Sequence, residues 1–114
     1  AITLEGKDGA EQIKNIMEKV RNNPPNVVGE KHVIKFIDYK KEIGINMQDG
    51  KEEKTNLPNS NVLYLELEND NWCCIRPSGT EPKIKVYIGA KGESMQEAQK
   101  IMQNLEEEAQ KLLK

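Results

Sequence analysis

The sequence has few of the residues that most often carry catalysis or bind metals. Its 114 residues include one histidine, two cysteines and 4% aromatic residues. His32 has no carboxylate or cysteine at a motif spacing, so we expect it at a strand edge or on the surface and not in catalysis. Cys73 and Cys74 are adjacent within a strand-like run, where neighbouring side chains point to opposite faces. They cannot pair with each other or supply a zinc site, so we expect two reduced thiols, one more buried than the other.

Long apolar runs and a strong excess of one charge are also absent. No run approaches the length that crosses a bilayer, and residues 1–8 lack the basic-then-apolar order of a signal peptide. The formal net charge is −2 although 32% of the residues are charged, so no basic field would attract nucleic acid or an anionic membrane. We therefore predict a cytoplasmic protein without a membrane or nucleic-acid partner. Its length suits one domain, residues 1–114, with a core of its own.

Two segments have the apolar spacing of amphipathic helices. The first covers residues 8–22, is capped by Asp8 and ends before two consecutive prolines. The second covers residues 94–113 and opens on a capping box formed by Ser94 and Glu97. The apolar stripes, which we expect to face the core, consist of Ala10, Ile13, Ile16, Met17 and Val20 in the first helix, and Met95, Ala98, Ile101, Met102, Leu105, Ala109, Leu112 and Leu113 in the second.

Four segments alternate as strands do: residues 31–39, 62–68, 72–76 and 83–89. The alternation in the first is too irregular to show which of its faces is buried. The second and third are joined by residues 69–71, an Asn-Asp-Asn turn that tolerates positive φ, so they are predicted to form a hairpin.

Residues 40–61 are polar and rich in turn formers, with an exposed turn at Asp49-Gly50. Whether residues 44–47 add a short strand is left open by the pattern. A connection of this length is either a mobile excursion or a surface meant for another domain. The order of elements predicts an α+β fold, an antiparallel four-stranded sheet with both helices packed on one face.

The loop after the third strand has the chemistry of an anion cradle. Arg76 offers a planar fork for bidentate contact with phosphate, and Ser78 and Thr80 offer hydroxyl donors. Gly79 allows consecutive amides to point inward, and prolines stiffen both ends of the loop. The strand after the loop places Lys85 on the side away from its apolar face, where a second cation can converge on the loop. The alternative is an ordinary hairpin connection, because the same residue types are common in turns.

The run R-P-S-G-T-E-P-K-I-K-V-Y, residues 76–87, resembles the C-terminal phosphate-binding loop of the phosphohexomutases, the phosphoglucomutase and phosphomannomutase superfamily. Residues 61–72 and 89–92 look most like the bacterial phosphoglucomutase branch, and the resemblance is strong over residues 57–92. It implies the fourth, C-terminal domain of such an enzyme, with a TATA-binding-protein-like fold. Carried over, Arg76, Ser78, Gly79 and Thr80 match the residues that bind the non-transferring phosphate, Gly79 through its backbone. Lys85 matches a basic position that is arginine in many relatives.

The resemblance also implies an activity that this chain does not carry alone. Phosphohexomutases interconvert hexose 1-phosphates and hexose 6-phosphates through a bisphosphate intermediate, using a phosphoserine, Mg²⁺ and a sugar-reading loop in earlier domains. None of those three motifs occurs here, so we expect no catalytic residue, metal ligand or cofactor in this chain, and no mutase activity from it alone. Mg²⁺, a glucose or mannose phosphate substrate and the missing N-terminal domains would belong to the full-length enzyme.

Two other functions remain open. The chain would be a stand-alone binding module if it bound another phosphorylated ligand and not glucose phosphates. It would be a nucleic-acid binder, by analogy of fold, if it gave a strong salt-dependent shift of DNA. The acidic charge balance opposes the second alternative.

Overall fold

The computed structural model describes residues 9–78 and 83–113. In chain order the elements are α1 (Gly9–Asn22), β1 (Val27–Val28), β2 (Lys31–Asp38), β3 (Ile43–Asn46), β4 (Glu52–Lys54), β5 (Leu63–Leu67), the short 3-10 helix η1 (Glu68–Asp70), β6 (Trp72–Pro77), β7 (Ile84–Gly89) and α2 (Met95–Leu112). The predicted helices and strands correspond to α1, β2, β5, β6, β7 and α2, with ends that agree within one residue. Asp8, the predicted cap of the first helix, lies outside the described residues.

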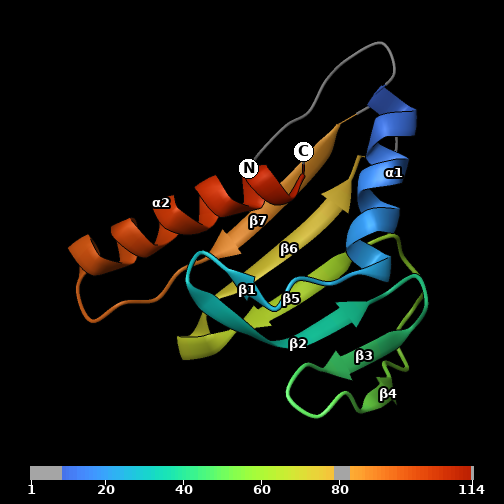
Figure 1. The fold of residues 1–114 in the computed structure, drawn as a ribbon, viewed down its shortest axis with the longest axis horizontal. Helices are drawn as coiled ribbons and strands as arrows, with labels where there is room; N and C mark the ends of the chain where they lie inside the picture. The colour runs from blue at the N-terminus through green and yellow to red at the C-terminus, as the bar shows by residue number, and fades with distance from the viewer. Residues whose placement is uncertain (1–8, 79–82, 114) are drawn as a thin grey trace.

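The strands form one antiparallel sheet in the order β4-β3-β2-β5-β6-β7, and β1 pairs with the free part of β2. Both helices lie on the same face of this sheet, α1 beside β5 and β6 and α2 along β7 (Figure 1). The predicted α+β class with two helices on one face is therefore confirmed. The predicted count of four strands is wrong, because the sheet has seven strands.

The extra strands come from segments that carry almost no strand pattern. The chain turns after β3 because Asn46 accepts hydrogen bonds from the backbone of Gln48 and Gly50, and Gly50 has a φ of 74°. The returning strand β4 is three residues long and fully exposed, so it has no buried face to produce alternation. The strand left open at residues 44–47 is present as β3.

A β-bulge explains the irregular alternation of β2. Val33 pairs with Leu67, but two residues later Lys35 pairs with Glu66, so the register shifts between them. Because of the extra residue, Val33 and Phe36 both point into the core although they are three positions apart. After the bulge the alternation is regular, and Lys35 and Ile37 face away from the helices.

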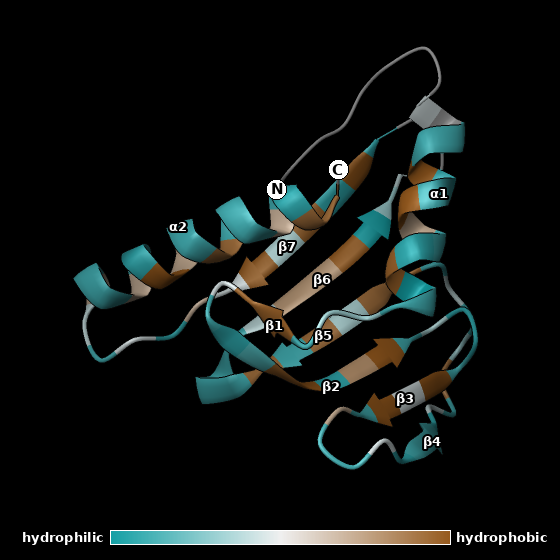
Figure 2. Cartoon of the chain, in the orientation of Figure 1, coloured by the Kyte–Doolittle hydropathy of each residue, from teal (hydrophilic) through white to brown (hydrophobic). Residues whose placement is uncertain are grey.

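The core lies between the helices and the sheet. Figure 2 shows hydrophobic strand residues behind two helices whose visible surface is mostly hydrophilic. Within the described residues the core consists of Ile13, Ile16, Met17, Val20, Val28, Val33, Phe36, Leu63, Leu65, Leu67, Cys73, Ile75, Ile84, Val86, Leu105, Ala109 and Leu113. The first half of α2 adds no fully buried residue: Ile101 is partly buried and packs against the core, whereas Met95, at the start of the predicted stripe, is 77% exposed. Neither described helix is both long and apolar enough to cross a membrane.

A buried ion pair fastens α1 to the sheet. The guanidinium of Arg21 donates to Asp38 Oδ2 at 3.0 Å, to Glu18 Oε1 at 2.8 Å and to Asn61 Oδ1 at 2.6 Å. Asp38 uses its other carboxylate oxygen to accept from the backbone N–H groups of Lys40 and Lys41. One arginine thus joins the last turn of α1, the end of β2 and the segment that enters β5.

The turn between β1 and β2 holds a glutamate in a conformation suited to glycine. Gly29 and Glu30 have φ values of 54° and 67°, the left-handed pair of a two-residue hairpin. A residue with a Cβ in the left-handed conformation costs roughly 1–2 kcal/mol. Glycine avoids this cost but loses more conformational entropy on folding, so its net advantage is smaller. We expect Glu30→Gly to raise the free energy of unfolding by about 0.5–1 kcal/mol, measured by urea denaturation. Gly29→Ala should lower it, because a Cβ there would meet Leu105 Cδ2 at 2.9 Å; equal stability of the two variants would contradict this account.

Candidate phosphate-binding site

Two cations face each other where β6 and β7 approach the predicted loop. Arg76 on β6 pairs directly with Lys85 on β7, and the backbone N–H of Ser78 donates to Lys83 O at 2.7 Å. The Ser78 amide therefore closes the hairpin instead of pointing into an anion cradle. Gly79 and Thr80, the other two predicted phosphate ligands, lie outside the described residues. The structure thus brings together Arg76, Ser78 and Lys85, at one end of the sheet.

Both cations lie on the sheet face that carries no helix. Ile75 and Val86, which flank them on the same strands, are buried in the core, while Arg76 and Lys85 are exposed. The predicted position of Lys85, opposite the apolar face of its strand, is confirmed. Within residues 9–78 and 83–113, neither the side chain of Arg76 nor that of Lys85 makes a hydrogen bond or an ion pair.

This pairing is electrostatically unfavourable without a counter-ion. Directly opposite residues in an antiparallel sheet have Cβ atoms about 4.5–5.5 Å apart, and like charges at such positions destabilise the pair. An anion held between the two head groups would turn this repulsion into two attractions. The guanidinium also influences its own strand: burial raises the pKa of the half-buried Cys74 thiol, and the charge of Arg76 opposes that rise.

The two thiols are not reactive groups. Both are free, Cys73 being buried and Cys74 half-buried, as predicted. Burial, with a smaller contribution from Cys74, raises the pKa of Cys73 to about 12. Because the thiolate is the nucleophile and both thiols are shifted away from it, neither is suited to covalent catalysis near neutral pH.

His32 has a structural role at the surface, as expected. Its side chain is exposed, and its backbone N–H and ring Nδ1 lie 2.8 and 2.9 Å from Glu68 Oε1. The backbone hydrogen bond, followed by the bond to the ring, lowers the pKa of the Glu68 carboxyl. These contacts hold η1 against the start of β2. Among the described residues no three His, Cys, Asp or Glu side chains gather as they would around a metal ion.

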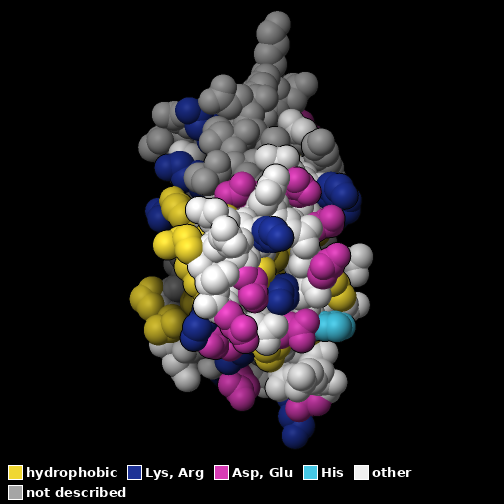
Figure 3. Space-filling model, turned by 90° about the vertical axis from the view of Figure 1, so that its left-hand side faces the viewer, with side chains coloured by type: hydrophobic (Ala, Val, Ile, Leu, Met, Phe, Trp, Pro, Cys, Tyr) yellow, Lys and Arg dark blue, Asp and Glu magenta, His cyan; other side chains and the backbone are white. Residues whose placement is uncertain are grey.

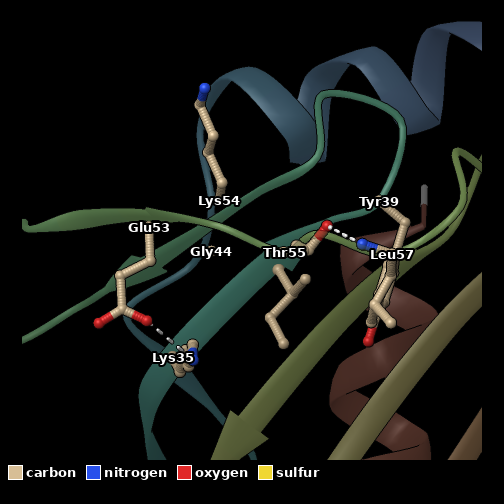
Figure 4. Close-up of a pocket in the computed structure, with 8 residues that line it drawn as sticks. Lys35, Tyr39, Gly44, Glu53, Lys54, Thr55 and Leu57 are labelled. Carbon is tan, nitrogen blue, oxygen red and sulfur yellow. Dashed lines mark hydrogen bonds and ion pairs between the residues drawn. The ribbon is translucent and has the colours of Figure 1, made fainter.

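A hollow of about 220 Å³ on the helix-free face was not predicted (Figure 4). Gly44 of β3 contributes no side chain there, so Ile37 of β2 is left open beside it. Its lining comes from the β2, β3 and β4 region: Lys35, Ile37, Tyr39, Gly44, Glu53, Lys54, Thr55 and Leu57. Figure 4 looks onto this face with the helices behind the strands; Lys35 and Glu53 point toward each other at 3.9 Å, and Lys54 extends away. In the sequence, the one signal of this hollow is Gly44, a glycine within a strand.

Comparison with known proteins identifies the family. Residues 37–108 match the family described as "Phosphoglucomutase/phosphomannomutase, C-terminal domain". The phosphoglucomutase of Staphylococcus haemolyticus is 39% identical over 85 residues, covering 75% of this chain and 15% of that protein. The phosphoglucomutase of Staphylococcus saprophyticus is 38% identical over 97 residues, covering 85% of this chain and 17% of that protein. No solved structure matches the chain.

The matched segment starts near the end of β2 and includes every strand from β3 to β7 and most of α2. It therefore contains the Arg76–Lys85 pair and the loop between them. The chain spans only about a sixth of the length of these relatives. With the family match over more than half of its length, the chain belongs to the phosphoglucomutase/phosphomannomutase C-terminal domain family.

Proposed function

We propose that this chain is the substrate-phosphate-binding domain of a phosphohexomutase that interconverts hexose 1-phosphates and hexose 6-phosphates. The observation that carries the proposal is the exposed Arg76–Lys85 pair, two directly opposed cations without an anionic partner among the described residues. Ser78 lies next to them, and the resemblance adds the Gly79 backbone and the Thr80 hydroxyl. Together these groups would grip the phosphate that is not transferred.

The role proposed for this domain is to position the substrate. A planar guanidinium binds two phosphate oxygens at once, whereas the ammonium of Lys85 acts as a point charge. Binding the distal phosphate uses remote contacts to place the reacting end of the sugar, and closing the domain over it excludes water. The site reads an anion and no feature of the sugar, so it would accept either phosphate of the bisphosphate intermediate.

The other parts of the reaction are assigned to the rest of the protein. The preceding domains would supply the phosphoserine, the Mg²⁺ ion and the sugar-reading loop. The substrate would be a glucose or mannose phosphate, the location the cytoplasm, and the fold the TATA-binding-protein-like arrangement implied by the resemblance. The matched phosphoglucomutases, of which this chain spans 15–17%, leave room for those domains.

Phosphate should stabilise the isolated chain through the two cations. A ligand that binds the folded state raises stability by RT ln(1 + [L]/Kd), so phosphate at about ten times Kd should add about 1.4 kcal/mol. We expect this gain in urea denaturation at constant ionic strength, and its loss in Arg76→Ala. Without phosphate, Lys85→Gln should be as stable as the unmodified chain or more stable, because it removes the repulsion between opposed cations.

Phosphate also stabilises proteins in general by exclusion from their surface, so a control is needed. Lys14→Ala removes an exposed lysine from α1, on the other side of the sheet, and should keep the full gain. If phosphate raises the free energy of unfolding of Arg76→Ala and Lys14→Ala equally, Arg76 is not part of an anion site. Replacing phosphate with glucose 6-phosphate separates the proposal from the stand-alone module: a module for another ligand would respond to phosphate and not to the sugar phosphate.

A further inference from the structure

The helix-free face of the sheet carries an apolar row that crosses five strands. Cross-strand pairing aligns Gly44 on β3, Ile37 on β2, Tyr64 on β5, Cys74 on β6 and Tyr87 on β7. Tyr87 is 42% exposed and the three side chains before it are partly exposed. We call these five residues the apolar row. An antiparallel sheet with one solvated face normally places polar residues there, so this row needs an explanation.

A stacked aromatic pair widens the row. The rings of Tyr64 and Trp72 lie 5.9 Å apart with planes inclined by 17°. Trp72 lies over Gly89 on the next strand, where a Cβ would overlap the indole. The pair is thus fixed against the sheet backbone and presents a rigid, apolar surface. Rigid aromatic side chains of this kind are favoured where proteins bind one another, because little side-chain entropy is lost on binding.

The hollow described above lies at the β3 end of the apolar row. Ile37 and Gly44 belong to the row and also line the hollow, and Leu57, which is 51% exposed, lines the hollow as well. In the side view of Figure 3 hydrophobic side chains gather along one flank, while acidic and basic side chains are interspersed over the middle of the molecule. An apolar strip that ends in a small hollow can receive a flat surface and one protruding side chain. Such strips, bordered by charge, mark interaction sites.

The charges beside the row point to the position of the occupant. On β6 and β7, Arg76 and Lys85 are the outward-facing neighbours of Cys74 and Tyr87, on the side toward the loop that joins the two strands. The row therefore borders the proposed phosphate site. A partner seated on the row would lie beside that phosphate. The relatives contain about five times as much chain outside the matched segment as within it, since the match covers 15–17% of their length. For a C-terminal domain, that additional chain precedes it.

We propose that the apolar row and its hollow form the surface on which the preceding domains of a phosphoglucomutase dock. The proposal rests on the proposed function, because it takes the chain to be part of such an enzyme. The preceding domains would present an apolar segment to Tyr64, Trp72 and Tyr87. Docking at this face would keep the Arg76–Lys85 pair at the edge of the interface, where it can contact a phosphate shared by both parts.

Hydroxyl-radical footprinting tests this surface without altering it. Tyrosine, tryptophan and methionine side chains are oxidised at rates that follow their exposure, so the aromatic residues of this surface serve as probes of their own burial. The isolated chain is compared with a hybrid enzyme, in which it replaces the matching segment at the end of the S. haemolyticus phosphoglucomutase. In the hybrid we expect oxidation of Tyr87 and Trp72 to slow by about threefold or more, because docking would cover both side chains. Met95 on α2, 77% exposed on the opposite layer, is the internal control and should keep its rate.

A titration provides a second measurement that does not depend on the fusion. The truncated relative, lacking its matched segment, is added to the chain labelled with 5-fluorotryptophan at Trp72, its only tryptophan, and the ¹⁹F signal is followed. Tyr87→Lys should weaken binding by about tenfold, because it places a charge within the apolar contact. Val27→Lys, at an exposed apolar residue of β1, should not weaken it.

Each outcome decides the question. Equal oxidation of Tyr87 in the folded hybrid, protection confined to α2, or binding that Tyr87→Lys leaves unchanged would overturn the proposal. Protection of Tyr87 that rises with the concentration of the isolated chain would assign the face to a second copy and also overturn it. The phosphate response of the isolated chain is read separately, so failure of the docking surface and failure of the proposed function are distinguishable.

Discussion

Arg21→Ala is expected to lower the free energy of unfolding by about 3–5 kcal/mol, the range found when one partner of a buried ion pair is removed. The side chains of Arg21 and Asp38 are 2% and 5% exposed. Without the guanidinium, the Asp38 carboxylate stays buried with two backbone N–H donors and no opposite charge. Asn61 loses its hydrogen-bond donor as well, and Glu18 is left with the ion pair to Lys40 at 4.0 Å. Urea denaturation followed by circular dichroism measures the loss.

Two further variants separate the charge from the helix. Lys19→Ala, at an exposed position of the same helix, should change stability by less than about 0.5 kcal/mol. The double variant Arg21→Met with Asp38→Leu should recover most of what Arg21→Met alone loses, because a well-packed apolar pair can replace a buried ion pair. A loss below about 1 kcal/mol in Arg21→Ala would show that the network contributes little.

Elements with a buried face could be predicted from the sequence. In β5 the buried residues Leu63, Leu65 and Leu67 alternate with the partly exposed Tyr64 and the exposed Glu66. In α1 the buried residues return every three or four positions. The turn at residues 69–71 also followed from its residue types, since Asn69 and Asp70 have φ values of 60° and 61°. Ser94 accepts a hydrogen bond from the backbone of Glu97, as the capping box predicts.

Features that depend on tertiary contacts could not be predicted. Arg21 follows the apolar stripe of α1, yet an arginine is normally exposed, and only its meeting with Asp38 makes burial favourable. The bulge in β2 is set by pairing with β5, and β1 and β4 are too short to carry a periodic signal.

The proposed phosphate site and the surface beside it also contain one part that could be predicted from the sequence and one part that could not. Alternation along two strands of a hairpin was enough to place Lys85 on the outward face, and the pairing with Arg76 follows from their register. The apolar row cannot be recognised from the sequence, because Tyr64 and Tyr87 fall at outward positions of strands that have the ordinary pattern of half-buried strands. Whether an outward residue meets water or another domain is decided by what covers the sheet, and sequence periodicity carries no information on that.

In the hybrid enzyme, Arg76→Ala is expected to lower kcat/KM on the order of 100-fold while leaving the fold intact. The guanidinium can make two charge-assisted hydrogen bonds to the distal phosphate, each worth roughly 1.5–3 kcal/mol, and desolvation offsets part of that. A net loss of about 3 kcal/mol corresponds to this factor. Both kcat and KM should change, because remote binding also positions the reacting end of the sugar. Steady-state kinetics with glucose 1-phosphate measures both.

Graded substitutions test the chemistry of the contact. Arg76→Lys keeps the charge but loses the planar fork, so its kcat/KM should fall between those of the unmodified hybrid and Arg76→Ala. Lys85→Ala should cost about tenfold, since a single point charge is removed. Lys14→Ala on α1 should have no effect. Stability should not follow activity, because the side chain of Arg76 makes no hydrogen bond or ion pair within residues 9–78 and 83–113. A purified Arg76→Ala hybrid with unaltered kinetics would show that this arginine does not bind substrate.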